Sequence, residues 1–421
     1  MPPSQPIRAA RGVRDVLPGE RAAWAQVEQA AARVARSFGY QEIEVPIIEP
    51  AELVERMGED TDVVAKEIYR FQDRGGRWLA LRPEATAGVV RAYFEGGLQA
   101  GPQPARLYLL GPMFRYDRPQ AGRYRQFHQL DVEAIGDPSP ALDAEIIELA
   151  AGWLNALGLR DVRLELNSIG DSRCRPAYLR LLQDYYRPHK EKLHPDCQRR
   201  LETNPLRLLD CKEERCQPFK ARAPRVTDHL CEPCQEAFSE VRGLLDAAGI
   251  EYQLNPFLVR GLDYYTRTVF EFQHEALGGA QNSLVGGGRY DGLASALNWP
   301  DTPAVGFAAG LERVLSMMKR EGEEVVPAPA AGLLVLPAEP GLSVAAAQVA
   351  RSCREAVATA VDYSERSLRA KMRAAAKAGA RWVAIFNREE GARKVVQLRE
   401  MTSGEQAEVA WADLPERLIS S

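Results

Sequence analysis

Polar and apolar residues alternate most regularly in the segment 127–134, and alternation with a period of two is typical of a β-strand. One face of this strand holds Phe127, Gln129, Asp131 and Glu133. The opposite face holds His128, Leu130, Val132 and Ala134. A second predicted strand begins at Leu107 and ends at Arg115, and the loop between the two strands contains Arg118, Arg123 and Arg125. Four guanidiniums beside amide and carboxylate groups fit two interpretations: a solvated hairpin with incidental ion pairs, or a pocket for a ligand that is anionic at one end and cationic at the other.

Apolar positions at helical spacing predict amphipathic helices over residues 19–39, 87–95 and 141–157. The run 304–319 is apolar on almost every face and is also predicted as a helix. Strands are expected at residues 40–48, 79–84, 162–167, 252–258 and 268–273. Pro46 cannot donate a ladder hydrogen bond, so its strand is expected at a sheet edge or with that nitrogen facing away from a neighbour.

Strand alternation disappears between about Ser172 and Gly249, where charge density rises, and this segment is predicted to be a mostly helical insertion. The proline- and alanine-rich stretch 325–332 is predicted to be a linker. Beyond it, residues 333–421 alternate predicted strands with predicted helices, as in a small α/β domain. We therefore expect one large α+β domain over residues 1–324 that contains the insertion, followed by a linker and a small domain.

The chain has 421 residues, of which 45% are hydrophobic and 27% charged, as in soluble globular proteins. No apolar run approaches the roughly 20 residues of a membrane-spanning helix, and the N-terminal segment lacks the apolar core of a secretory signal. Seven cysteines, an odd number, argue against a disulfide framework, so a cytoplasmic location without membrane partners is expected. A net charge of −4 excludes a uniformly basic nucleic-acid binder but not a local basic surface.

Several short segments contain side chains that suit a ligand. Glu84 and Thr86 follow a predicted strand and suit an ammonium group, although a first-turn acid favoured by the helix dipole explains Glu84 equally well. In LVRGLDYYTRT, Arg260 and Asp263 lie beside two tyrosines. If this segment is extended, Tyr264 and Tyr265 point to opposite sides, and only one of them is expected to bind a ligand.

Two further features are less specific. The glycine run 286–288 would let the backbone approach a nucleotide or phosphate, but such runs are more often turns, and neither a Walker loop nor a dinucleotide fingerprint is present. Arg313 lies on the apolar helix predicted at 304–319. A buried arginine of this kind requires a carboxylate partner or an anionic ligand.

Four cysteines of the insertion are candidates for a metal site. Cys211 and Cys216 are separated by four residues, and Cys231 and Cys234 by two. Four thiolates could hold a tetrahedral zinc ion, but only the second pair has a spacing typical of zinc ligands. Reduced cysteines inside a helical insertion explain the same pattern, so the sequence alone assigns no metal ligand.

These segments together resemble histidyl-tRNA synthetase, a family of class II aminoacyl-tRNA synthetases, from near residue 11 to the C-terminus. RGVRDVLPGE is similar to the opening of the family, GYQEIEVPIIEP to class II motif 1, FRYDRPQAGRYRQFHQLDVE to motif 2 and GFAAGLERVL to motif 3. Those motifs alone would indicate only the class, whereas LVRGLDYYTRTVFEF and GGGRYDGL resemble the histidine-specific signatures. Ala85 departs from the pattern, since the family usually has glycine there.

The resemblance implies a class II α+β catalytic domain with an antiparallel sheet of six or seven strands flanked by helices. It also implies a helical insertion that reaches the tRNA acceptor stem and a C-terminal α/β anticodon-binding domain. The implied reaction is the ATP-dependent ligation of L-histidine to tRNA(His) through a histidyl-adenylate, with release of pyrophosphate and AMP. Mg²⁺ as a cofactor and a homodimeric assembly are implied as well.

The resemblance also assigns roles to individual residues. Glu84, Thr86 and Gln129 correspond to ligands of the substrate ammonium group. Glu133 and Tyr265 correspond to residues that bind the imidazole, and Tyr264 is expected beside them. Arg115 and Arg260 correspond to the α-phosphate ligands, which makes them the expected catalytic residues and part of the histidine site. Arg123 and Arg313, together with Arg115, are expected to bind ATP, the first two near its distal phosphates and adenine.

Two alternatives are kept open. A synthetase-like regulatory subunit of the first histidine-biosynthesis enzyme would typically lack the C-terminal domain and have eroded signatures. A class II synthetase of the proline, threonine or glycine type is disfavoured by RGLDYY.

The C-terminal segment 327–421 has 13 Lys and Arg against 11 Asp and Glu, a net charge of +2 where the rest of the chain has −6. Five of these basic residues fall within 367–381: Arg369, Lys371, Arg373, Lys377 and Arg381. They form either an ordinary solvated helix or a surface for anticodon-stem phosphates.

Overall fold

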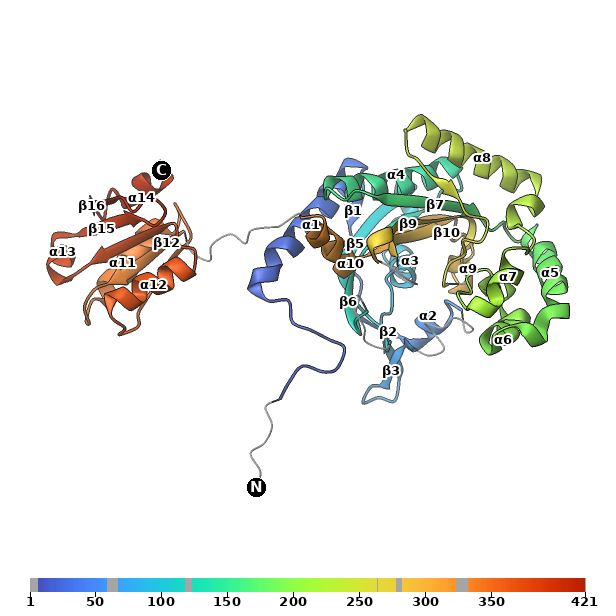
Figure 1. Ribbon diagram of the computed structural model, residues 1–421, viewed down its shortest axis with the longest axis horizontal. Coiled ribbons are helices and arrows are strands. Elements are labelled where there is room, and N and C mark those ends of the chain that lie inside the picture. Colours follow the sequence, from blue (N-terminus) through green and yellow to red (C-terminus); the bar gives the residue numbers. More distant parts are fainter. Residues whose placement is uncertain are drawn as a thin grey trace, which may run out of the picture. The chain divides into compact units, whose positions relative to one another are not determined.

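The computed structural model describes residues 7–58, 67–117, 123–262, 264–277, 282–322 and 332–420. The chain divides into two compact units, Met1–Val325 and Val326–Ser421 (Figure 1). Each unit has a hydrophobic core of its own. Among the described helices, none has both the length and the apolar character that crossing a membrane requires.

The first unit is built on an eight-stranded sheet in the order β1-β5-β6-β11-β10-β9-β7-β8. In that order the strands are Gln41–Glu42, Ala105–Phe114, Gln126–Ile135, Ala304–Gly310, Ser283–Arg289, Thr266–His274, Val162–Ser168 and Gln253–Leu254. The six central strands are antiparallel to their neighbours, while β1 and β8 each pair in parallel at an edge. The predicted antiparallel sheet is confirmed, with eight strands in place of six or seven.

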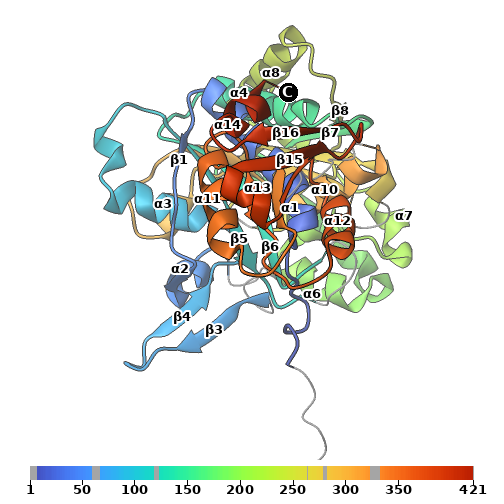
Figure 2. The ribbon, with the colours of Figure 1, turned by 90° about the vertical axis from the view of Figure 1, so that its left-hand side faces the viewer.

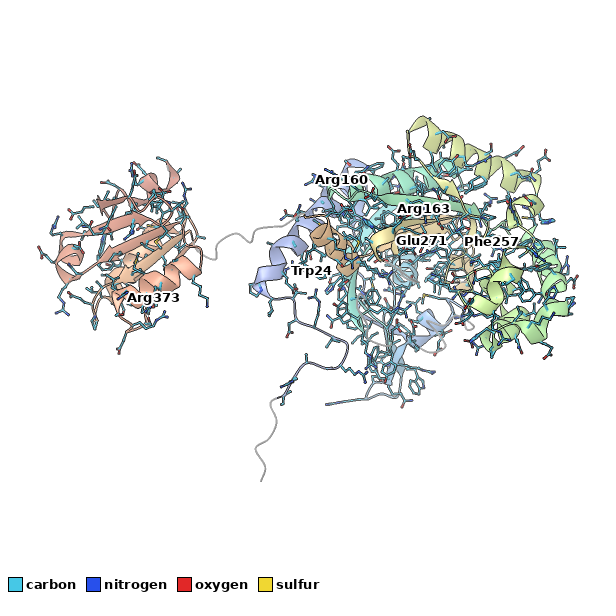
Figure 3. The ribbon with its side chains drawn as sticks, in the orientation of Figure 1. Trp24, Arg160, Arg163, Phe257, Glu271 and Arg373 are labelled. Atoms are coloured by element: carbon cyan, nitrogen blue, oxygen red, sulfur yellow. The ribbon has the colours of Figure 1, made fainter. Side chains whose placement is uncertain are left out.

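One face of this sheet is covered by the helices α1 (Pro18–Ser37), α4 (Pro140–Ala156), α8 (Glu232–Ala247) and α10 (Leu311–Arg320). The apolar face of β6 packs here, because Leu130 and Val132 belong to the same buried cluster as Trp24 of α1 (Figure 3) and Trp153 of α4. The helices at residues 19–39 and 141–157 are thus confirmed to within two residues.

The opposite face of the sheet presents the polar residues of β6. Helix α3 (Thr86–Glu95) lies against this face, since the Thr86 hydroxyl donates a hydrogen bond to Glu133 of β6. The alternation predicted for segment 127–134 therefore separates a core face from a face that is free for chemistry.

The predicted strand at residues 40–48 is wrong. The chain pairs with β5 only at Gln41–Glu42 and then leaves the main sheet. It enters a three-stranded sheet, β2-β4-β3, as β2 (Ile48–Pro50), beside β4 (Trp78–Leu81) and β3 (Tyr69–Gln72). Pro46 lies in the gap between the two sheets, where no ladder donor is needed. Figure 2 shows the β3–β4 hairpin extending away from the main sheet.

The predicted helix at residues 304–319 is wrong over its first half. Ala304–Gly310 form strand β11, and helix α10 begins at Leu311. Val305 and Phe307 pack into the apolar core, while Gly306 and Ala308 line the opposite face. Because the cavity face of β11 holds small residues in place of polar ones, the sequence of this strand shows no alternation of polar and apolar positions. The strand predicted at 252–258 is also shorter, because β8 spans only Gln253–Leu254.

Residues 172–249 contain α5 (Arg175–Tyr186), α6 (Pro195–Thr203), α7 (Gln217–Lys220), α8 and short 3-10 turns, and every residue of this segment is described. None of them forms a strand, so the prediction of a mostly helical segment is confirmed.

The second unit is a five-stranded sheet in the order β13-β12-β14-β15-β16. The strands are Thr359–Val361, Leu333–Pro337, Trp382–Phe386, Val395–Glu400 and Gln406–Ala410. Helices α11 (Ser343–Cys353) and α14 (Leu414–Ile419) pack on one face, and α12 (Leu368–Lys377) packs on the other. A further short helix, α13 (Arg388–Arg393), precedes β15. The predicted α/β alternation is confirmed, while β13, β15 and β16 were not predicted.

Candidate active site

One cavity of about 370 Å³ opens on the polar face of the main sheet. All ten site residues assigned from the sequence line it: Glu84, Thr86, Arg115, Arg123, Gln129, Glu133, Arg260, Tyr264, Tyr265 and Arg313. They come from the start of α3, the β5–β6 hairpin, the loop before β9, and α10. Arg118 and Asp263 lie outside the described residues.

Glu133 is held at the floor of this cavity by two hydroxyl groups. Thr86 Oγ1 donates to one carboxylate oxygen at 2.7 Å, and the Tyr290 hydroxyl donates to the other. Burial raises the pKa of Glu133 well above its ordinary value, and the two hydrogen bonds oppose that rise. A Cβ atom at Gly306 would overlap the Glu133 carboxylate, so β11 needs glycine here to seat the side chain. The result is a fixed acceptor whose orientation is set by its surroundings.

Glu84 combines the two roles that the sequence left open. Its carboxylate accepts hydrogen bonds from the backbone N–H groups of Thr86 (3.1 Å) and Ala87 (3.0 Å), as an acid at a helix N-terminus does. It also accepts from the Tyr264 hydroxyl at 3.3 Å and lines the cavity. Ala85 has φ −103° and ψ −24°, which any L-residue adopts, so its side chain places no strain on this turn.

Two polar groups of β6 are buried without hydrogen-bond partners among the described residues: the Gln129 amide oxygen and the Asp131 carboxylate. Burial raises the pKa of Asp131 well above its ordinary value; the charge of Glu84 raises it further, and Arg82 and Arg115 oppose it. Asp131 was not assigned as a site residue from the sequence, although the alternation placed it on the same face of β6 as Gln129 and Glu133. Unsatisfied buried polar atoms are rare, and the Gln129 oxygen, whose residue lines the cavity, is available to a ligand there.

Both tyrosines of the RGLDYY segment line the cavity, and the condition for placing them on opposite sides, an extended segment, is not met. The segment is not extended at this point, and the two ring centroids lie 4.8 Å apart with an interplanar angle of 40°. Burial raises the pKa of Tyr265 to about 12, and the nearby Arg260 charge opposes that rise. Both hydroxyls therefore remain protonated at neutral pH and can donate or accept.

Four guanidiniums line the same cavity, those of Arg115, Arg123, Arg260 and Arg313. Arg260 forms an ion pair with Glu271 at 3.2 Å, and Arg123 forms one with Asp117 at 3.0 Å. Figure 3 marks Glu271 on strand β9. Arg115 donates from Nε to the Pro83 carbonyl at 2.8 Å.

Arg313 donates to the Ser283 carbonyl at 3.0 Å. Burial lowers its pKa, and the positive charges of Arg123 and Arg115 lower it further. Crowded guanidiniums of this kind favour a bound polyanion, because a phosphate would relieve their mutual repulsion.

The glycine run 286–288 is not a turn, as the sequence suggested, but part of strand β10. A Cβ atom at Gly286 would overlap the Arg260 guanidinium, so the glycine makes room for that side chain. Tyr290 and Glu271 were missed as functional residues. Both lie within the quoted signatures, but nothing in their spacing showed that they hold Glu133 and Arg260.

His128 lies on the apolar face of β6, as the alternation predicted. Its ring contacts Trp24 edge-on at 4.8 Å, and its Nδ1 lies 3.1 Å from Glu312 Oε1. Its partners are therefore a core aromatic ring and a carboxylate of α10.

The four cysteines considered as one zinc set do not meet. Cys231 and Cys234 lie together with Asp171 and Cys174, whereas Cys211 and Cys216 lie together with Cys197. The spacing along the chain could not reveal this division, because Cys174 and Cys197 come from other parts of the insertion.

The basic helix of the second unit has fewer available cations than its sequence suggested. Lys371 is buried and donates from Nζ to the carbonyls of Pro337 (2.9 Å) and Asp362 (3.3 Å). Arg369, Arg373 (Figure 3) and Lys377 are exposed on α12. Lys371 is therefore removed from the predicted phosphate-binding set.

An antiparallel sheet with a carboxylate site and a guanidinium cluster on one face, linked to a separate mixed α/β unit, defines a class II aminoacyl-tRNA synthetase. Residues 12–173 and 200–314 match the family model described as histidyl-tRNA synthetase, and residues 333–421 match an anticodon-binding domain. The chain is 50% identical over 416 residues to the histidine–tRNA ligase of Desulforudis audaxviator (strain MP104C), with 98% of each chain covered. The chain therefore belongs to the histidyl-tRNA synthetase family.

Solved structures agree with this result. The apo histidyl-tRNA synthetase of S. aureus superposes with a TM-score of 0.83 at 34% identity, covering 98% of this chain and 100% of that one. A Bacillus halodurans protein titled an ATP phosphoribosyltransferase regulatory subunit/histidyl-tRNA synthetase matches at a TM-score of 0.65 and 22% identity, covering 90% and 98%. That second match shows a shared fold only.

Proposed function

We infer that this chain is a histidine–tRNA ligase, which joins L-histidine to tRNA(His) at the expense of ATP. The observation that supports this most strongly is that all ten residues assigned from the family's motifs line one cavity, in a chain that matches the family over nearly its whole length. The reaction passes through a histidyl-adenylate and releases pyrophosphate and then AMP.

The first step is attack of the histidine carboxylate on the α-phosphorus of ATP. An α-carboxyl group has a pKa of roughly 3.5, so it is ionised at neutral pH and needs no general base. The obstacle is the approach of an anion to a polyanion, which positive charge around the phosphorus removes. Arg115 and Arg260 bind the α-phosphate in this proposal, and Arg123 and Arg313 bind nearer the distal phosphates and adenine.

Mg²⁺ fits this cavity, because the carboxylates of Asp117 and Glu312 line it beside the guanidiniums, and a hard cation prefers carboxylate and phosphate oxygens. When bound together with ATP, it would neutralise part of the polyphosphate charge. The assignment of Arg115 and Arg260 to the α-phosphate does not depend on it.

The carboxylate end of the cavity selects histidine. Glu84, Thr86 and Gln129 bind the substrate ammonium group, which would give the buried Gln129 oxygen the partner it lacks. Glu133 accepts one imidazole N–H, and Tyr265 serves the other ring nitrogen with Tyr264 beside it. A side chain without either nitrogen leaves a buried partner unsatisfied, which can discriminate by about 10⁴ or more.

In the second step the 3′-terminal ribose hydroxyl of the tRNA attacks the activated carbonyl. We propose residues 1–324 as the catalytic domain, with an insertion at about 172–249 that reaches the acceptor stem. The linker 325–332 then connects it to the anticodon-binding domain, 333–421. Arg369, Arg373 and Lys377, all exposed on α12, are the candidates for anticodon-stem phosphates.

A homodimer is supported by the small sheet, whose strand β2 forms the end of motif 1. Ile48 of β2, Phe71 of β3 and Trp78 of β4 expose between 38% and 50% of their surface, an unusual concentration of exposed apolar residues. Light scattering should return a mass near twice 46.7 kDa. A mass near the single-chain value would contradict the dimer.

Pyrophosphate exchange with each amino acid in turn tests the function. Only histidine should support exchange, and it should do so without tRNA. A regulatory subunit would bind histidine without exchange. Exchange with proline, threonine or glycine would instead assign another class II specificity.

A further inference from the structure

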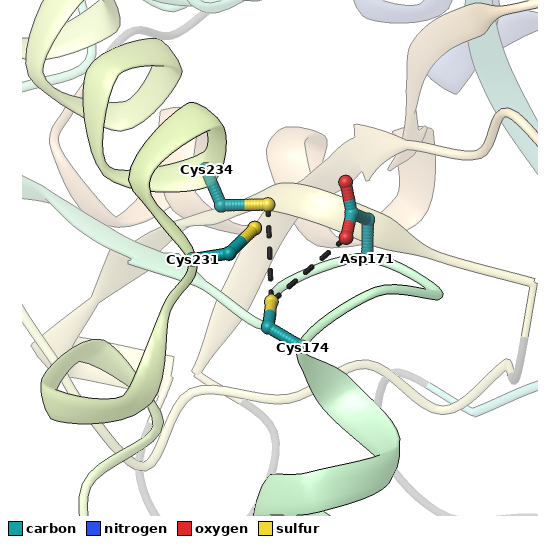
Figure 4. Close-up of side chains that lie close together, drawn as sticks. All are labelled: Asp171, Cys174, Cys231 and Cys234. Carbon is teal, nitrogen blue, oxygen red and sulfur yellow. Dashed lines mark hydrogen bonds between the residues drawn. The ribbon is translucent and has the colours of Figure 1, made fainter.

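Three cysteines and an aspartate meet where the helical insertion joins the main sheet (Figure 4). Asp171 and Cys174 follow strand β7 and immediately precede α5, while Cys231 and Cys234 lie at the first turn of α8. One ligating atom of each residue lies within 4.8 Å of every other, and Cys174, Cys234 and Asp171 are buried. Corresponding members of the two pairs are 60 positions apart, yet each pair has the same spacing: two residues intervene in Asp171-x2-Cys174 and in Cys231-x2-Cys234. A spacing of two is that of paired ligands in structural zinc sites.

The distances between these atoms suit a single tetrahedral ion. Cys174 Sγ lies 3.9 Å from Cys234 Sγ and 3.9 Å from Asp171 Oδ1. A zinc–thiolate bond of about 2.3 Å places two sulfurs of a tetrahedron about 3.8 Å apart. The cysteines are free rather than disulfide-bonded, and a sulfur–sulfur distance of 3.9 Å is far longer than a covalent bond. An iron–sulfur cluster would need wider spacing, because each thiolate then binds a different iron.

The surroundings of the four groups are arranged for an anionic metal centre. Asp171 accepts at its Oδ2 atom from the Arg173 guanidinium at 2.6 Å and from Arg267 at 3.5 Å. Its Oδ1 atom accepts from the backbone N–H of Arg173 at 3.0 Å and lies 3.9 Å from Cys174 Sγ, on the side of the sulfurs. Three thiolates and a carboxylate around a divalent cation have a net charge of −2, which these two guanidiniums balance. Gly170 has φ +66°, and a Cβ atom there would come within 2.7 Å of Cys174 Sγ, so glycine gives the sulfur its space. Outer hydrogen bonds of this kind orient metal ligands.

We propose that Asp171, Cys174, Cys231 and Cys234 bind one structural zinc ion. Zinc prefers thiolate and carboxylate ligands in a closed tetrahedral site, and none of the four groups is used by the ligation chemistry. Binding replaces the three thiol protons, which are released to solvent. The ion cross-links the segment before α5, which holds Asp171 and Cys174, to the first turn of α8, which holds Cys231 and Cys234. Arg175 extends that connection to the active site, because its Nη2 donates to the Tyr265 carbonyl at 2.7 Å.

The second cysteine cluster serves as an internal comparison. Cys197, Cys211 and Cys216 are all buried and also lie within 4.8 Å of one another. Among the described residues, no fourth His, Cys, Asp or Glu places a ligating atom within 4.8 Å of all three sulfurs. His194 lies beside the group through its backbone, since its N–H donates to Cys216 Sγ at 3.3 Å, but its imidazole is not among these ligating atoms. A closed zinc site needs four ligands, so the proposal is confined to the Asp171 cluster.

Zinc content of the full chain tests the proposal. The protein would be purified in a reducing buffer, loaded with Zn²⁺ and freed of excess metal by gel filtration. Its zinc content per chain would then be measured by inductively coupled plasma mass spectrometry. Wild-type protein should retain tightly bound zinc, and Cys174→Ser should lower its zinc content by about one equivalent. The matched control is Cys353→Ser, a buried cysteine of the second unit that belongs to neither cluster. It should retain the wild-type zinc content.

A chelator provides an independent measurement. Removing zinc should lower the Tm of the wild type and of Cys353→Ser, while the Tm of Cys174→Ser should not respond. If Cys174→Ser fails to fold, Asp171→Cys replaces it: a fourth thiolate should keep the zinc and slow its release to the chelator. The proposal is overturned if zinc-loaded wild type retains no metal. It is equally overturned if Cys174→Ser retains the wild-type content, or if Asp171→Cys releases zinc faster than wild type.

Discussion

Replacing Arg260 by alanine should nearly abolish adenylate formation, and the structure separates the two reasons. The first is chemical: removing one preorganised donor from a developing charge costs about 10²–10³ in rate, or about 2.7–4 kcal/mol. The second is structural, because Arg260 is ion-paired with Glu271 at 3.2 Å and both side chains are about four-fifths buried. Breaking a fully buried pair costs about 3–5 kcal/mol, so this partly exposed pair should cost about 2–3 kcal/mol of stability.

A double variant distinguishes these effects. Glu271→Gln removes the carboxylate that Arg260→Ala would leave unpaired, so the combined variant should recover most of the lost Tm. It should not recover histidine-dependent pyrophosphate exchange. Arg260→Lys keeps the charge but not the planar fork, so its exchange rate should fall between those of wild type and Arg260→Ala.

The assays are pyrophosphate exchange and calorimetric unfolding of the same four preparations. The KM for histidine should change much less than the exchange rate does, since Arg260→Ala leaves Glu84, Gln129 and Glu133 in place. Near-normal exchange in that variant would remove Arg260 from the mechanism. Recovery of exchange together with Tm in the double variant would show that its role is structural.

The remaining predictions concern Tyr290, Asp131 and the second unit. Tyr290→Phe removes a hydrogen bond to the Glu133 carboxylate, so the KM for histidine in exchange should rise about 10- to 100-fold with the KM for ATP unchanged; an unchanged histidine KM would refute it. Asp131 has a raised pKa in the folded protein, so the folded state binds more protons than the unfolded one and stability falls as pH rises above about 4. The Tm of Asp131→Asn minus the Tm of the wild type should therefore increase as the pH rises from 5 to 8. A difference that stays constant over this range would contradict the prediction. Deleting residues 327–421 should abolish aminoacylation, while histidine-dependent pyrophosphate exchange by the truncated chain should survive. If the truncated chain folds but loses both activities, the assignment of tRNA binding alone to the second unit is contradicted.

Much of the fold was predictable because hydrophobic periodicity is a local property. The alternation in β6 correctly separated Leu130 and Val132, which are in the core, from Gln129 and Glu133, which line the cavity. Periodicity failed in β11, because the face that lines the cavity holds only small residues there, Gly306 and Ala308, and the segment therefore matches a helical pattern. It also failed near Pro46, because the change from one sheet to another depends on partners distant in sequence.

The site shows the same limit. Motif resemblance gave the residues that line the cavity, since those residues lie in recognisable segments. It did not give Tyr290 or Glu271 their roles, because these depend on which atoms meet across strands. The cysteines are the clearest case: Cys231-x2-Cys234 was visible in the sequence, but its partners Asp171 and Cys174 are 60 residues away, and only folding brings them together.

The most direct test of the central claim is a crystal structure of the protein with a non-hydrolysable histidyl-adenylate analogue. We expect the guanidiniums of Arg115 and Arg260 within hydrogen-bonding distance of the α-phosphate oxygens, and one imidazole nitrogen on the Glu133 carboxylate. An analogue bound with both arginines turned away from its phosphate, or with the imidazole directed away from Glu133, would contradict the account.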